Sequence, residues 1–145
     1  MNFSYFKPPV TSNITPLKTM DLRNVWMIIL SDELKAVTQK VRSGKASKTD
    51  ILPFITASGQ FRKRNLQDLI TYSGIISIDL DNCDIGMKNS LENDPFLQPS
   101  LIFVSPSGTG LKLFYQLAHA DSSLHLTYFN AITTWLKEHY LLSAD

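Results

Sequence analysis

The chain has 145 residues, 43% of them hydrophobic and 19% charged, which is the composition of one ordinary globular domain. Its single cysteine, Cys83, excludes an intramolecular disulfide framework and indicates a reducing cytoplasm, and no apolar run is long enough to cross a membrane. The net charge of +1 divides into +6 for residues 1–72 and −5 for residues 73–145. This asymmetry suits a polyanion held beside an acidic metal centre, although solvated helix faces would explain it equally well.

The first half of the chain alternates between strand and helix patterns. Residues 2–6 alternate polar and aromatic side chains and predict a strand. Residues 19–41 show helical spacing, and a capping pattern near Ser31 divides them into two helices. A short strand is expected at residues 54–57, and Asn65 is expected to cap a helix that carries Leu66, Leu69, Ile70 and Tyr72.

The second half predicts a strand within residues 74–81, ending at Asp79–Asp81, and a short helix at 85–93. Strands at residues 100–104 and 111–117 flank a tight turn and therefore form a hairpin. An amphipathic helix follows over residues 121–140. Together these elements predict an α+β fold, with helices packed on a mainly antiparallel sheet. The strand that ends at Asp79–Asp81 is expected to be central and to pair with the hairpin, which would bring Lys112 near it, and the helix at 121–140 is expected to pack on one sheet face.

Two carboxylates lie at the end of the most apolar predicted strand. The run of residues 75–78 leads directly into Asp79-Leu80-Asp81. Because side chains alternate along a strand, Asp79 and Asp81 point to the same face. Two like charges are costly to bury unless a cation neutralises them, and Mg²⁺ or Mn²⁺ suits such oxygens. The alternative is that the strand simply ends at Asp79 and both acids are solvated turn residues.

A glycine-rich turn joins the strands of the predicted hairpin. Its sequence is Ser105-Pro-Ser-Gly-Thr-Gly110, and Lys112 follows after one residue. Backbone N–H groups and hydroxyls gathered in such a turn suit phosphate oxygens, and lysine adds a point charge. It is not a Walker A loop, because Leu111 precedes the lysine and no helix follows. An ordinary hairpin turn is the alternative. The candidate nucleotide-binding residues are Ser105, Ser107, Gly108, Gly110 and Lys112.

The two motifs in combination resemble those of the archaeo-eukaryotic primase superfamily. Within it, the chain looks most like the primase-like N-terminal domain of virulence-associated protein E-type proteins of mobile elements. The stretches at residues 55–61, 69–74 and 104–112 add to the likeness, which covers residues 1–145. The resemblance implies a single domain with an RRM-like primase-polymerase core. It also implies that the chain is an N-terminal fragment of a longer protein with a helicase region.

The resemblance also implies roles for individual residues. Asp79 and Asp81 match the motif that holds the catalytic metals, and Asp145 is the candidate for a third carboxylate. Lys112 stands where many primase-polymerases have a histidine that contacts the triphosphate. Arg62, Lys63 and Arg64 are expected to contact nucleic-acid phosphates without sequence preference.

The leading hypothesis is a cytoplasmic, Mg²⁺- or Mn²⁺-dependent nucleotidyltransferase domain. It would act on a nucleoside triphosphate and a DNA or RNA template during replication of a mobile element, with no membrane partner. A second hypothesis is a catalytically inactive nucleic-acid-binding module of the same fold. A third is a metal-dependent nuclease, because nucleases also use clustered carboxylates.

Overall fold

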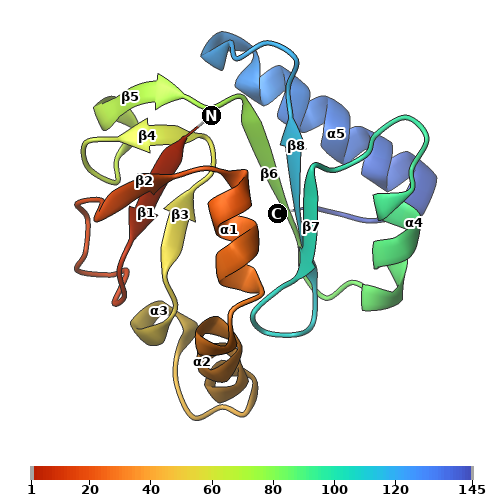
Figure 1. Ribbon diagram of the computed structural model, residues 1–145. Coiled ribbons are helices and arrows are strands. Elements are labelled where there is room, and N and C mark those ends of the chain that lie inside the picture. The colour runs from red at the N-terminus through yellow and green to blue at the C-terminus, as the bar shows by residue number, and fades with distance from the viewer. Residues whose placement is uncertain (1, 145) are drawn as a thin grey trace. The chain divides into compact units, whose positions relative to one another are not determined.

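The computed structural model describes residues 2–144, which fold as two compact units (Figure 1). The N-terminal unit ends at Ser73 and the C-terminal unit begins at Gly74. The basic half of the sequence therefore forms one unit and the acidic half forms the other. The strands are β1 (Phe3–Phe6), β2 (Lys18–Met20), β3 (Phe54–Thr56), β4 (Gly59–Phe61), β5 (Leu69–Tyr72), β6 (Ile75–Leu80), β7 (Leu101–Val104) and β8 (Leu111–Gln116). The helices are α1 (Leu22–Ile29), α2 (Asp32–Arg42), α3 (Lys48–Ile51), α4 (Lys88–Glu92) and α5 (His125–Tyr140).

All strand pairs of the described residues are antiparallel, which confirms the predicted α+β class. The pairs form three small sheets, with the orders β2-β1-β3, β4-β5 and β6-β8-β7. None of the helices within residues 2–144 has the length and apolar character that crossing a membrane requires.

The N-terminal unit joins its two sheets through one buried hydroxyl. Ser4 lies on β1 and is 1% exposed. Its Oγ accepts the backbone N–H of Phe61 at 2.8 Å and donates to the Phe61 carbonyl at 3.3 Å. A buried hydroxyl needs partners of this kind, because an unsatisfied polar group in the core is destabilising. The two contacts tie β4 to β1.

Two capping side chains divide the predicted helical stretch. Asp21 Oδ1 accepts the N–H of Asn24 at 2.8 Å and begins α1. Ser31 Oγ accepts the N–H of Leu34 at 3.2 Å and begins α2. Each cap satisfies a backbone donor that the first turn of a helix leaves unpaired. The predicted break near Ser31 is confirmed.

The helix predicted after Asn65 is wrong. Asn65 does cap, by accepting the N–H of Gln67 at 2.8 Å, but only a single 3-10 turn follows before β5 begins. β5 pairs with β4, a strand that the sequence analysis missed. Leu69 to Tyr72 includes β-branched and aromatic residues, which favour an extended conformation once a partner strand is adjacent. The leucine and isoleucine side chains whose spacing suggested a helix face are largely exposed, and Leu66 is 90% exposed.

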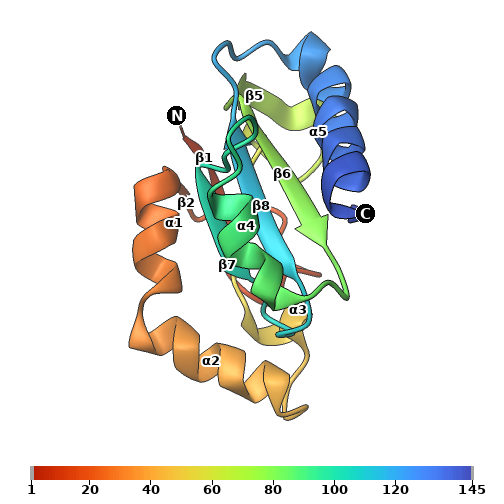
Figure 2. The ribbon, with the colours of Figure 1, turned by 90° about the vertical axis from the view of Figure 1, so that its right-hand side faces the viewer.

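The C-terminal unit is built on the sheet β6-β8-β7, with α5 along one face (Figure 2). That face is lined by alternate strand residues and covered by apolar residues of α4 and α5. The buried members are Ile76, Ile78, Leu80, Leu91, Ile102, Leu111, Leu113, Tyr115, Leu117, Ile132 and Leu136. Removal of this apolar surface from water is the main term that holds the unit together.

The acidic strand was expected to be the central strand of its sheet, but β6 lies at an edge. β8 pairs with both β6 and β7, so the returning strand of the hairpin lies in the middle. The predicted pairing of the acidic strand with the hairpin is confirmed, and so is the packing of the last helix on one sheet face. The apolar side chains of β6 are therefore buried by side-chain packing, and their burial does not require a paired strand on both sides of β6.

Candidate functional site

The carboxyl end of β6 carries Asp79 on the face opposite the apolar core, and Asp81 follows in the turn after the strand. Ile78 and Leu80 are fully buried against the α5 side, whereas Asp79 between them is half-buried and Asp81 beyond the strand is exposed. Strand alternation therefore separates Asp79 from the core, as predicted, whereas Asp81 lies in the turn beyond the strand, where alternation does not set its direction. The core face fixes the strand, and the fixed strand sets where Asp79 points.

Lys112 of β8 is the cross-strand partner of Asp79. Its Nζ donates to Asp79 Oδ2 in an ion pair, and the two side chains keep 30% and 45% of their surface exposed. An ion pair with this much solvent access contributes at most about 1 kcal/mol to stability. The pair therefore matters more for the electrostatics of the site than for the fold.

The turn between β7 and β8 is closed by two backbone hydrogen bonds. Ser105 N–H donates to the Gly110 carbonyl at 2.8 Å, and Gly108 N–H donates to the Ser105 carbonyl at 2.9 Å. Gly108 has φ of 83°, in the left-handed region where a side chain would be strained. These constraints give the turn one defined shape.

Three hydroxyls line this turn. Ser107 Oγ lies 2.9 Å from Ser105 Oγ and 3.1 Å from Thr109 Oγ1, so the three form a hydrogen-bonded row. Thr109 was not among the residues selected from sequence. Its signal was the spacing Ser-x-Ser-x-Thr, which places a hydroxyl at every second position of the turn.

Gly110 brings the turn against the end of β6. A Cβ at this position would lie 2.2 Å from the Leu80 carbonyl oxygen and 3.2 Å from the Asp81 Cα. Backbone atoms cannot move aside as a flexible side chain can, so only glycine permits this approach. The hydroxyl turn, Lys112 and the two acids therefore meet at one end of the sheet.

The donor set of this site fits a divalent cation that is shared with phosphate. Among residues 2–144, no group of three or more histidine, cysteine, aspartate or glutamate side chains is placed to hold a metal ion. Asp145, the expected third ligand, lies outside the described residues. Mg²⁺ commonly binds through one or two carboxylates together with substrate phosphates. Asp79 and Asp81 supply donors of that kind.

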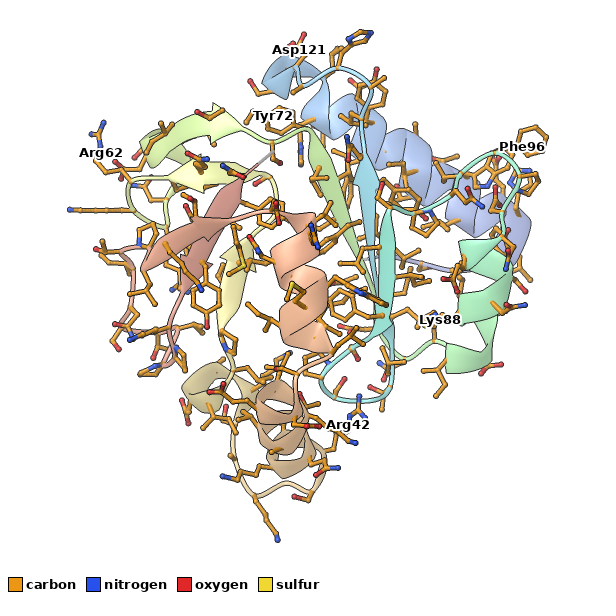
Figure 3. The ribbon with its side chains drawn as sticks, viewed as in Figure 1. Arg42, Arg62, Tyr72, Lys88, Phe96 and Asp121 are labelled. Carbon is orange, nitrogen blue, oxygen red and sulfur yellow. The ribbon has the colours of Figure 1, made fainter. Side chains whose placement is uncertain are left out.

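The predicted nucleic-acid-binding residues belong to the N-terminal unit, in the connection between β4 and β5. Arg62 lies at the outer end of this hairpin and points away from the ribbon, with its guanidinium 4.0 Å from Asp68 (Figure 3). Lys63 is exposed. The Arg64 guanidinium lies over the Phe54 ring, 5.5 Å from its centroid, in a cation–π contact. Arg62 and Lys63 are thus more available to a ligand than Arg64.

A buried carboxylate that the sequence analysis did not select, Asp94, anchors α5. Asp94 is 5% exposed and accepts hydrogen bonds from the Tyr140 hydroxyl, the Trp135 indole and two backbone N–H groups. Burial alone would raise the pKa of Asp94, but these hydrogen bonds lower it to about 2. The same contact to Asp94 raises the pKa of Tyr140 to about 12. The neighbouring Phe96 projects outward beside the anchor (Figure 3).

The sequence comparisons place the chain in a family other than the one expected. Residues 47–141 match the sequence model of the family described as BT4734-like, N-terminal domain. The match covers about two thirds of the chain and includes both the acidic strand and the hydroxyl turn. Comparison with curated proteins and with solved structures gives no match.

The inferred membership in the primase-like domain of virulence-associated protein E-type proteins is therefore wrong. An Asp-x-Asp strand end and a serine-glycine turn are short patterns, and each satisfies a local geometric or electrostatic need that many folds share. Their combination was consequently less specific than it looked. The match over residues 47–141 shows that the chain belongs to the BT4734-like family, in the region of its N-terminal domain.

Proposed function

We propose that the C-terminal unit binds a nucleoside triphosphate with Mg²⁺ or Mn²⁺ and transfers its nucleotidyl group to a nucleic-acid strand. The observation that carries the proposal is the meeting of three chemical groups at one end of the sheet. These are the carboxylates of Asp79 and Asp81, the ammonium of Lys112 and the hydroxyl turn over residues 105–110. The expected link to mobile-element replication depended on the corrected resemblance and does not enter the proposal.

The residues of the site divide the work between cation and phosphate. Asp79 and Asp81 hold the cation, which supplies charge neutralisation at the phosphates when it is bound. Lys112 and the exposed hydroxyls of Ser107 and Thr109 hold the triphosphate by charge-assisted and neutral hydrogen bonds, whereas the buried Ser105 hydroxyl supports that of Ser107. In the transfer itself, a strand hydroxyl oxygen forms a bond to the α-phosphorus and loses its proton to solvent, and the α–β phosphoanhydride bond breaks to release pyrophosphate.

The basic residues of the N-terminal unit supply the proposed contact to the strand. Arg62 and Lys63 are exposed and lie in a unit whose charge is +6 in the sequence. Binding of this kind would be independent of base sequence and would weaken with salt. A cytoplasmic location agrees with Cys83, the only cysteine, being a free thiol.

One observation favours a second candidate, an inactive nucleic-acid-binding module. Asp79 already has a cationic partner in Lys112, and within residues 2–144 the site offers two carboxylates. A site that had lost its cation would keep such an ion pair, because it neutralises a charge that would otherwise repel Asp81.

The two candidates differ in one experiment. The protein is incubated with a labelled primer, a template, nucleotides and Mn²⁺, and the labelled strand is sized. Extension in the wild type that is lost in Asp81→Asn and retained in Glu138→Gln supports the transferase. Glu138→Gln is the control, because it removes a carboxylate from an exposed position of α5. A labelled strand of unchanged length would contradict the transferase and leave the binding module as the candidate. A shortened strand would indicate a nuclease.

A further inference from the structure

The ion pair between Lys112 and Asp79 joins two groups to which the proposed function gives different ligands. Asp79 is assigned to the cation and Lys112 to the phosphate, yet Lys112 Nζ donates directly to Asp79 Oδ2. The cross-strand register holds their backbones opposite each other. The structure therefore pairs the group assigned to the cation with the group assigned to the phosphate.

A lysine in this position opposes the binding of a free divalent cation. It occupies one oxygen of Asp79, and its positive charge repels any second cation that approaches the other oxygen. Asp81 makes no hydrogen bond or ion pair within residues 2–144, so it alone would remain to attract the cation. One exposed carboxylate is a weak ligand for Mg²⁺, which gives up its water reluctantly.

Arrival of a triphosphate changes this balance. Phosphate oxygens offer Lys112 a more strongly charged partner than Asp79, and the half-exposed side chain is free to turn toward them. Once Lys112 contacts phosphate, both Asp79 oxygens are open to the cation, which the phosphates also help to coordinate. Each ligand then removes an obstacle to the other.

We propose that Lys112 is a stand-in cation for Asp79 that keeps the empty site closed to free divalent ions and couples cation binding to triphosphate binding. This inference rests on the proposed function, because it assumes that cation and triphosphate share the site. Reciprocity is a thermodynamic requirement: if triphosphate tightens the cation, the cation tightens triphosphate by the same factor.

The test measures Mn²⁺ affinity by electron paramagnetic resonance of the free ion, with and without a non-hydrolysable triphosphate analogue. Lys112→Met removes the charge and keeps most of the side-chain length, and Lys112→Gln is a second neutral variant in case the first folds poorly. Lys112→Arg is the charge-preserving control. Thermal unfolding of each variant checks that the fold is retained.

For the neutral variants we expect Mn²⁺ alone to bind about three- to fivefold more tightly than in wild type, the effect of losing one partly exposed charge. We also expect the tightening of Mn²⁺ by the analogue to shrink, whereas Lys112→Arg retains both wild-type values. Unchanged or weaker binding of Mn²⁺ alone in Lys112→Met and Lys112→Gln would overturn the inference.

Failure of the inference is distinct from failure of the proposed function. Primer extension in the wild type, with no gain of Mn²⁺ affinity in the neutral variants, would reject only the stand-in role of Lys112. A gain of Mn²⁺ affinity in the neutral variants, without primer extension in the wild type, would reject nucleotidyl transfer and leave the role of Lys112 supported. Absence of any coupling in the wild type would reject the inference directly.

Discussion

Gly110 lies so close to Leu80 that a Cβ on Gly110 would be 2.2 Å from the Leu80 carbonyl oxygen. This contact sets the distance between the hydroxyl turn and the acidic strand end, and it involves backbone on both sides. The position of the turn is therefore a property of the sheet and not of a side chain that can change rotamer.

Gly110→Ala should consequently destabilise the protein and displace the turn. We expect a loss of about 1–3 kcal/mol in the free energy of unfolding, the usual cost of forcing an extra methyl group into a packed position. Urea unfolding followed by circular dichroism measures it. Gly86→Ala is the matched control, because its nearest neighbour is the movable Asp84 side chain at 3.1 Å. Equal losses in the two variants would show that the close approach is unimportant.

Asp94→Asn should weaken the anchor of α5 in a pH-dependent way. The pKa of Asp94 is about 2 in the folded protein, against an ordinary value of 3.8, so the folded state prefers the charged form. This stabilisation is fully present above the unfolded pKa and is lost as pH falls through the folded pKa. Its size at neutral pH is about 2 kcal/mol.

The measurement is the free energy of urea unfolding at pH 7, 4.5 and 3 for wild type and Asp94→Asn. We expect the difference between them to be constant from pH 7 to 4.5 and to narrow at pH 3. Glu138→Gln, at an exposed position, should show no such trend. A difference that stays the same at all three values would mean that the charge of Asp94 does not stabilise the fold.

The sequence predicted the elements whose apolar residues repeat with one clear period. β6, the β7–β8 hairpin and α5 were all located, because their apolar positions alternate or recur at helical spacing and are buried in the structure. The nearness of Lys112 to the acidic strand also followed from the hairpin. Its direct pairing with Asp79 did not, because that depends on the register between β6 and β8.

The failures have equally local causes. Leu66, Leu69 and Ile70 have helical spacing by chance, since none is buried, and β5 depends on pairing with β4. Asp94 finds its partners Trp135 and Tyr140 more than 40 positions later, a contact that no pattern of neighbouring residues reveals. Single-sequence reasoning identifies local periodicity, whereas these features arise from tertiary contact.

The double substitution Asp79→Asn with Asp81→Asn should remove divalent-cation binding without loss of fold stability. Asp79 lies on the sheet face away from the core and is already neutralised by Lys112, and Asp81 is exposed in the turn beyond the strand. We expect the free energy of unfolding to change by no more than about 1 kcal/mol, the upper limit for the exposed ion pair between Lys112 and Asp79. Calorimetric titration with Mn²⁺ in the presence of a triphosphate analogue tests the binding. Affinity equal to that of wild type and of Glu138→Gln would show that the acids are only a strand end.

Lys112→Ala and Lys63→Ala should separate triphosphate binding from nucleic-acid binding. Lys112 lies beside the hydroxyl turn of the C-terminal unit, whereas Lys63 is exposed in the basic connection between β4 and β5. Loss of one charge-assisted phosphate contact costs about 1.5–3 kcal/mol, so we expect Lys112→Ala to weaken triphosphate binding roughly ten- to hundredfold. Its effect on single-stranded DNA should be small.

Lys63→Ala should do the reverse, and it is preferred to Arg64→Ala because Arg64 also packs over Phe54. We expect the affinity of Lys63→Ala for labelled single-stranded DNA to fall modestly. The plot of log affinity against log salt should become less steep by about 0.7, the value for one phosphate contact. Fluorescence anisotropy at several salt concentrations measures both, and calorimetry measures triphosphate binding. If each variant weakened the binding of triphosphate and of DNA to the same extent, the two units would not have separate binding roles. If Lys112→Ala left triphosphate affinity unchanged with Mn²⁺ present, the inactive binding module would become the better description of the protein.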